Sequence, residues 1–190
     1  MAQQPTLTTE RLILRPYELS DAADIQRLAG AREIAATTSA IPHPYEDGMA
    51  QEWIRPHQER FDEGTEVHFA LVDKVKKTFI GGMGLLGISR EHSRAELGYW
   101  VAVPYWNQGY CTEAGRAVLA YGFETLKLNR IYAHHFGQNP ASGRVMQKLG
   151  MKHEGHLRQH FCKWDDFVDF VLYGILQSEW RQKQEEVVGG

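Results

Sequence analysis

The sequence predicts a single-domain α/β protein with a mixed sheet, and three observations indicate this class. Alternating apolar and polar residues in RLILRPY (11–17) and EVHFALVD (66–73) are typical of strands. TEAGRAVLAYGFETL (112–126) has the pattern of a helix lying between strands. No linker divides the 190 residues, so we expect one domain over 1–190, with a core at about 8–180 and a short polar tail at 181–190.

Helices are expected between the first two strands. LSDAADIQRLAG (19–30) begins with Ser20 or Asp21 as an N-cap, and Gly30 ends it. MAQEWIRPHQERF (49–61) also has a helical pattern, and Pro56 is expected to kink it or to open its first turn.

The middle of the chain predicts a three-stranded antiparallel meander. EVHFALVD is followed by TFIGGMGLLGIS (78–89) and then by RAELGYWVAV (94–103). The glycines of the second segment indicate a bulge or a close approach of the backbone.

The C-terminal third alternates again before it closes in a hairpin. After the helix at 112–126 come a strand, RIYAHHF (130–136), and a short helix, PASGRVMQKL (140–149), ended by Gly150. LRQHFCK (157–163) and FVDFVLYGIL (167–176) then flank the turn WDD and predict a hairpin.

Composition excludes several classes of function. The net charge of −3 and the lack of a long basic cluster argue against a nucleic-acid partner, and no apolar stretch reaches the length of a membrane span. The two cysteines, Cys111 and Cys162, have neither disulfide-framework nor metal-ligand spacing, so no metal is expected. The N-terminus lacks the pattern of a secretory signal, and we expect a cytoplasmic protein.

The segment PYWNQGYCTEAG (104–115) places Gly109 between a strand and a helix. A helix start offers main-chain N–H groups without intrahelical partners, and a glycine lets an anion approach them. The Walker phosphate loop and the dinucleotide glycine triplet are both missing. What remains is a plain turn or a phosphate cradle made of the main-chain N–H groups of 108–112.

The surrounding residues resemble a known family. ELGYWVAVPYWNQGYCTEAGRAVLAYGF (96–123) resembles the acyl-CoA-binding motif Q/R-x-x-G-x-G/A of the GNAT acetyltransferases, with Trp106, Gly109 and Cys111 in its three defined positions. TERLILRPYELSDAADI (9–25) and NPASGRVMQKLGMKHEG (139–155) resemble segments of the branch that acetylates ribosomal-protein N-termini.

The resemblance implies a fold, a reaction and a cofactor site. The fold would be a mixed, mostly antiparallel sheet with a splayed central strand pair, flanked by helices. The reaction would be direct acetyl transfer from acetyl-CoA to an amine. Cofactor contacts would come from the last strand before the turn, the turn itself and the short helix after 136: Trp100, Val101, Val103, Gln108, Gly109, Tyr110, Cys111, Thr112, Asn139 and Ser142. For Thr112, a role as helix N-cap is the structural alternative.

The resemblance also implies two catalytic residues. Glu96 would accept the amine proton, although an ion pair with Arg94 is the structural alternative. Ser142 would protonate the CoA thiolate, because Met146 occupies the position where many family members carry a tyrosine. A local capping bond is the alternative role for Ser142.

The sequence also offers other candidates for the catalytic base and for the acceptor site. Three histidines are rival bases, and for each a structural or surface role is the favoured alternative: His68, His134 and His135. Aromatic residues near the N-terminal helices could line the acceptor site: His43, Tyr45 and Trp53.

The acceptor is the least determined part of the expected function. A protein or peptide N-terminal amine is favoured, and a polyamine, an antibiotic or an amino-acid-like amine is the alternative. A third hypothesis is that the protein is not an enzyme and only binds acyl-CoA. Family members of this kind occur as monomers and as homodimers.

Overall fold

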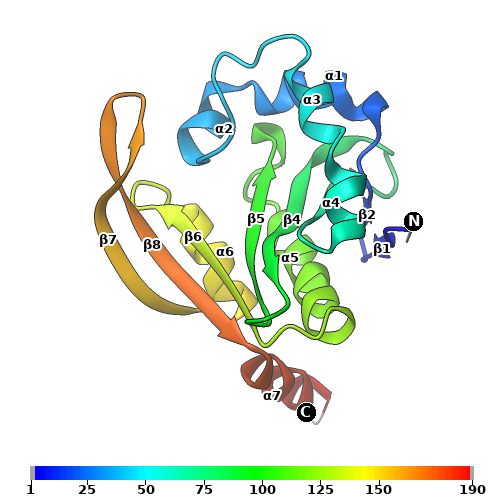
Figure 1. Cartoon of the computed structure of the whole chain (residues 1–190), viewed down its shortest axis with the longest axis vertical. Coiled ribbons are helices and arrows are strands. Elements are labelled where there is room, and N and C mark those ends of the chain that lie inside the picture. The colour runs from blue at the N-terminus through cyan, green and yellow to red at the C-terminus, as the bar shows by residue number, and fades with distance from the viewer. Residues whose placement is uncertain (1–2, 189–190) are drawn as a thin grey trace.

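The computed structural model describes residues 3–188, with side chains through Gln184, and is built on one eight-stranded sheet (Figure 1). The order across the sheet is β1-β2-β3-β4-β5-β6-β8-β7. Every neighbouring pair is antiparallel except β5 and β6. The strands are β1 (Leu7–Thr8), β2 (Leu12–Arg15), β3 (Val67–Asp73), β4 (Phe79–Ser89), β5 (Arg94–Val101), β6 (Arg130–Phe136), β7 (Lys152–Lys163) and β8 (Asp166–Leu176). The expected mixed, mostly antiparallel sheet is confirmed.

Strands β5 and β6 diverge after a short parallel contact. Arg94 to Glu96 pair with Arg130 to Tyr132, and beyond these residues β5 and β6 do not pair with each other. Residues 97–101 of β5 and 133–136 of β6 therefore border an opening in the middle of the sheet. The splayed central pair that the resemblance implied is present.

Helices cover both faces of the sheet (Figure 1). Residues of α5 and α6 share the main core with alternate residues of β3, including Val67, Phe69 and Leu71. Residues of α1 and α3 pack with Ala70, which points to the opposite face. The helices are α1 (Ala22–Ala29), α2 (Arg32–Thr37), α3 (Met49–Ile54), α4 (His57–Glu63), α5 (Tyr110–Ala120), α6 (Pro140–Leu149) and α7 (Gln177–Val188).

The close contact between α5 and α6 depends on Gly115. A Cβ atom at this position would lie 2.7 Å from the Leu149 side chain of α6. Burying a large apolar side chain such as Leu149 contributes roughly 1.5–3 kcal/mol, so this contact fixes α6 beside α5. The helix that carries Ser142 is thereby held against the helix that begins at Gly109.

The predicted meander is confirmed as β3-β4-β5, and its glycine-rich strand does contain an irregularity. The register of β4 against β5 shifts between Leu86 and Ser89, where Gly87 adopts a φ of 53°. The N-terminal region contains more helices than expected. Pro56 lies between α3 and α4, because proline removes a main-chain donor and interrupts the helix.

The closing hairpin is also confirmed, and it is longer than predicted. Strands β7 and β8 meet at a turn in which Trp164 and Asp165 both have positive φ. Strand β7 begins at Lys152 rather than Leu157. It is an edge strand with mostly exposed side chains, so it lacks the apolar alternation that sequence reading depends on. Residues 181–188, expected as part of a polar tail, continue α7, while 189–190 lie outside the described residues.

A buried histidine pair joins α4 to the sheet. His57 is 6% exposed and stacks on His68 of β3, with ring centroids 4.1 Å apart. Within the described part of the chain, neither ring nitrogen of His57 has a hydrogen-bond partner. Burial, together with His68 and Arg60, lowers the pKa of His57 to about 3.

We expect acid to destabilise the fold through His57. Between about pH 6.5 and pH 3 the unfolded chain binds a proton on this residue and the folded chain does not. The free energy of unfolding should therefore fall as the pH falls, by up to about 1.4 kcal/mol per pH unit from this residue. His57→Phe should flatten that slope in urea titrations at pH 7 and pH 5. The exposed His92→Phe is the matched control, and an unchanged slope in His57→Phe would contradict the assignment.

Candidate active site

The turn between β5 and α5 presents main-chain donors. Gly109 is the N-cap of α5, has a φ of 81° and has no side chain to cap the helix. The first intrahelical bond runs from the Glu113 N–H to the Gly109 carbonyl at 3.0 Å. The N–H groups of Tyr110, Cys111 and Thr112 precede that bond, at the positive end of the helix dipole. The geometry suits an anion.

An ion pair between distant residues fixes this turn. The Glu113 carboxylate accepts hydrogen bonds from the Thr9 hydroxyl at 2.6 Å and from the Arg11 N–H and Nε at 2.8 and 2.7 Å. Burial opposes ionisation of Glu113, but these bonds hold its pKa below the ordinary value. Arg11 Nη1 also donates to the Gln108 carbonyl at 3.0 Å. Sequence reasoning missed this anchor, since its partners are about a hundred residues apart.

The predicted phosphate-binding residues take different positions around the turn. Gln108 and Gly109 are exposed. The Tyr110 ring is buried under the Arg11 guanidinium, so only its main chain faces the turn. Burial raises the pKa of the Cys111 thiol to about 12, which keeps it protonated. Thr112 is 7% exposed and lies inside the first turn, so Gly109 rather than Thr112 is the N-cap.

The main-chain N–H and C=O groups of β5 point alternately to β4 and to the opening beside β6. The Ala102 N–H donates to the Ile80 carbonyl beside β4 at 2.9 Å. Because main-chain directions alternate along a strand, the main-chain groups of Trp100 also point to β4, and those of Tyr99 and Val101 point to the opening. For Trp100, the strand places its main chain away from the expected pantetheine edge.

Trp106 occupies one acceptor on that open edge. Its indole Nε1–H donates to the Val101 carbonyl at 2.6 Å, and its main-chain N–H donates to the Val103 carbonyl at 3.1 Å. The first position of the family motif therefore holds the end of β5 in place here. The Val101 N–H remains on the open edge.

Glu96 lies where β5 and β6 part. It is the last residue of β5 that pairs with β6, and its Oε1 lies 3.0 Å from Nδ1 of His134. His134 in turn stacks on Phe170 of β8, with centroids 4.2 Å apart. The contact of Glu96 is with His134, where the structural alternative had been an ion pair with Arg94.

The other two histidines have separate partners. His68 Nε2 contacts the Glu66 carboxylate at 2.8 Å. His135 points to the opposite face from His134, is buried, and has Nδ1 2.7 Å from the Phe136 carbonyl oxygen. Burial lowers the pKa of both His68 and His135. Of the three rival bases, His134 is the one in contact with Glu96.

The start of α6 brings Ser142 to β5. Asn139 is confirmed as the N-cap, because its side chain accepts from the Ser142 N–H at 3.3 Å. The Ser142 hydroxyl lies 2.8 Å from the Tyr99 hydroxyl. The capping bond thus uses the Ser142 main chain and leaves its hydroxyl for another role. Met146 is buried in the core.

The end of α2 lies beside these residues. The Asn139 Nδ2 donates to the Thr37 carbonyl at 3.5 Å. Lys163, at the tip of the β7–β8 hairpin, donates to the Thr38 and Ile41 carbonyls at 3.0 and 3.2 Å. The segment after α2 therefore spans from α6 to the hairpin tip, on the side of the sheet that carries the N-terminal helices.

The predicted acceptor aromatics separate into two groups. Trp53 packs edge-on to His57 and His68 on the face of the sheet that also carries Trp100. His43 and Tyr45 instead line an open hollow of about 590 Å³ beside α1.

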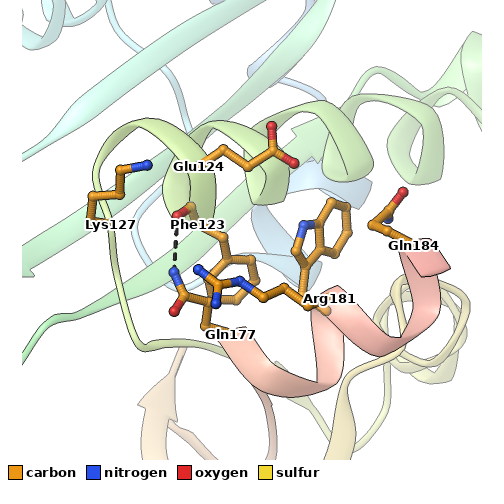
Figure 2. A pocket seen from close by; sticks show the side chains of 7 residues that line it. Phe123, Glu124, Lys127, Gln177, Arg181 and Gln184 are labelled. Atoms are coloured by element: carbon orange, nitrogen blue, oxygen red, sulfur yellow. Dashed lines mark hydrogen bonds between the residues drawn. The ribbon is translucent and has the colours of Figure 1, made fainter.

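A smaller hollow of about 280 Å³ lies between α7 and the π-helical turn Tyr121–Thr125, which continues α5 (Figure 2). Gln177 donates to the Phe123 carbonyl across it at 3.2 Å. It adjoins Leu176, which pairs with Arg130 at the far end of β6 from the opening. This hollow includes none of the predicted site residues on β5, at the start of α5 or on α6. Its lining is Phe123, Glu124, Lys127, Gln177, Trp180, Arg181 and Gln184.

Within the described residues, no cluster of three or more His, Cys, Asp and Glu side chains could hold a metal ion. No helix in that part of the chain is long and apolar enough to cross a membrane.

Comparison with known proteins decides the family. A family model described as an acetyltransferase (GNAT) domain matches residues 11–152, which include β5, the turn and α5. The chain belongs to the GNAT acetyltransferase family. It is accordingly an acetyl-CoA-dependent N-acetyltransferase, and the non-catalytic alternative is set aside.

Relatives of this GNAT enzyme differ in their acceptors. An uncharacterized N-acetyltransferase, p20 of Bacillus licheniformis, is 30% identical over 175 residues, 92% of this chain and 98% of that protein. The ribosomal protein uS5-alanine N-acetyltransferase of Escherichia coli is 26% identical over 184 residues, 92% of each chain, in agreement with the ribosomal-protein branch. The spermidine N-acetyltransferase of Vibrio cholerae, solved with CoA and spermine, is 27% identical with a TM-score of 0.78, covering 90% of this chain and 98% of that one.

Proposed function

We propose that this GNAT enzyme acetylates the N-terminal amine of a protein or peptide, of the ribosomal-protein type, by direct attack on acetyl-CoA. The observation that carries the proposal is the opening between β5 and β6. Glu96 stands where it begins, and the free main-chain edge of β5 leads from there to the turn at Gly109. The amine acceptor can reach the Glu96 end of this β5 edge, and acyl-CoA can reach the end at Gly109.

The main chain would hold the acyl-CoA. The N–H groups of Tyr110, Cys111 and Thr112 at the start of α5 would bind the pyrophosphate, with Gln108 and Gly109 completing the turn. The open edge of β5 would pair with the pantetheine arm as an added strand does, through Tyr99 and the Val101 N–H. Arg11, paired with Glu113, would hold the turn in place through its bond to the Gln108 carbonyl.

Glu96 and Ser142 would manage the protons. The Glu96 carboxylate, in contact with His134, would accept a proton from the attacking amine, directly or through water. Ser142 would give a proton to the sulfur as the C–S bond breaks. A main-chain N–H on the open edge of β5 would stabilise the oxyanion.

The charges that β3 to β6 direct to the acceptor face favour a peptide amine over a polyamine. Alternation along β3 to β6 leaves Glu96 as the one carboxylate that these strands direct to this face. A polyamine carries several ammonium groups, and each would need a partner when buried. A cytoplasmic location would give the enzyme access to new protein N-termini.

The acceptor is tested by thiol release from acetyl-CoA. Peptides that begin with Ala or Ser are expected to give a kcat/KM at least about ten times that of spermidine or an aminoglycoside. The same peptides with a blocked N-terminus and an internal lysine are the control. A clear preference for spermidine would favour the small-molecule alternative instead.

Glu96→Gln is expected to lower kcat by about 100-fold and leave the KM for acetyl-CoA unchanged, since the change removes a proton acceptor on the acceptor side. Steady-state kinetics with a saturating peptide acceptor measure this. Glu154→Gln is a matched control, because Glu154 also pairs with a basic residue of β6, Arg130, at 2.6 Å. Equal effects of the two changes would reject Glu96 as the base.

A further inference from the structure

A tyrosine on β5 reaches Ser142 from across the opening. Tyr99 belongs to the part of β5 that no longer pairs with β6. Its side chain points to the face covered by α5 and α6, since Leu97 and Val101, two residues away on either side, belong to the core on that face. Its hydroxyl oxygen lies 2.8 Å from Ser142 Oγ and 3.2 Å from the Ser142 carbonyl oxygen.

Every polar group of Ser142 is therefore engaged near the N-terminus of α6. Its N–H donates to the Asn139 side chain, and its carbonyl and hydroxyl both face the Tyr99 phenol. The family position for a tyrosine on this helix holds Met146, which is buried. The phenol near Ser142 comes from a strand instead of from the helix.

We propose that Tyr99 is a positioning residue that makes Ser142 an effective proton donor. The phenol has one proton and two Ser142 oxygens within reach, Oγ at 2.8 Å and the carbonyl oxygen at 3.2 Å. In the proposed arrangement this proton goes to Oγ, the nearer oxygen, which directs the serine proton away from Tyr99 and stabilises the negative charge that grows on Oγ. This inference rests on Ser142 being the proton donor of the proposed function.

The proposed step balances in atoms and charge. The amine nitrogen forms a bond to the acetyl carbon, the C–S bond breaks, and its electron pair goes to sulfur. The amine proton passes to Glu96, and the Ser142 hydroxyl proton passes to sulfur. Ser142 Oγ, held by the Tyr99 hydrogen bond, recovers a proton from water once the thiol has left, and Glu96 returns its proton to water.

The environment of Tyr99 suits a donor that stays neutral. Burial, together with the nearby Cys111, raises the pKa of the Tyr99 phenol well above its ordinary value. A serine hydroxyl without such a partner is a weak acid. A hydrogen bond to a charged group contributes more than one between neutral groups, and this one strengthens as the charge develops on Oγ.

Tyr99→Phe removes this hydrogen bond and keeps the ring. We expect kcat to fall about 10- to 100-fold, with the KM for acetyl-CoA within about twofold of wild type. Tyr173→Phe is the matched control, because the Tyr173 hydroxyl also bonds to α6, at Gln147 Nε2 3.1 Å away. The control is expected to keep the wild-type kcat.

A double-mutant cycle separates positioning from general damage to the fold. If Tyr99 acts through Ser142, then Tyr99→Phe should cause no further loss of kcat in the Ser142→Ala background. A wild-type rate in Tyr99→Phe, or an equal further loss in both backgrounds, would overturn the inference. A wild-type rate in Ser142→Ala would instead remove the proton donor of the proposed function, so the two failures are distinguishable.

Discussion

Gly109→Asp is expected to weaken acetyl-CoA binding by about 100-fold, which corresponds to about 2.8 kcal/mol. Two effects act together. A carboxylate would lie beside the N–H groups that face the pyrophosphate. The substituted residue, which carries a Cβ atom, would also have to adopt the φ of 81° that Gly109 has. Isothermal titration calorimetry with acetyl-CoA measures the change.

Two controls separate charge from backbone strain. Gly109→Ala keeps the strain, of about 1–2 kcal/mol, without the charge, and should lose less affinity. Gly48→Asp introduces the same charge at another N-cap glycine, with a φ of 88° and open space around its Cβ position, at the start of α3. Its acetyl-CoA affinity should match wild type. An unchanged affinity in Gly109→Asp would remove the turn from the cofactor site.

Ser142→Ala is expected to lower kcat by about 100-fold, the usual size of a general-acid contribution. The structure makes this change specific. The cap of α6 runs from Asn139 to the Ser142 main chain, so the helix start survives the loss of the hydroxyl. What disappears is the group at 2.8 Å from Tyr99.

The measurement for Ser142→Ala is single-turnover acetyl transfer compared with the Kd for acetyl-CoA. The rate should fall while the Kd stays within about twofold, because the pyrophosphate contacts lie on α5. Ser89→Ala, which removes a hydroxyl that accepts from the His92 N–H at the far end of β5, is the control. A wild-type rate in Ser142→Ala would reduce Ser142 to a residue of the helix start.

Sequence reasoning could predict the elements of this fold because local patterns determine them. Alternation identified β2 and β3, glycines located the irregularity in β4, and Asn139 followed by proline identified the start of α6. These signals act over a few residues and need no knowledge of register.

The same reasoning could not find contacts that register creates. Arg11 meets Glu113 only after α5 is placed beside β2. Tyr99 meets Ser142, and Glu96 meets His134, only after β5, β6 and α6 are placed side by side. Trp106 fills a motif position that resemblance assigned to the cofactor loop, yet its indole ends β5 by bonding to Val101. Each of these contacts joins residues whose pairing no local sequence pattern specifies.

The central claim is that acyl-CoA binds along the open edge of β5 and at the start of α5. An amide NMR titration of the 190-residue protein with CoA tests it most directly. We predict the largest shifts at the N–H groups of Tyr99, Val101, Tyr110, Cys111 and Thr112. Shifts confined to the residues around α7 and the π-helical turn, with the α5 start unchanged, would contradict the account.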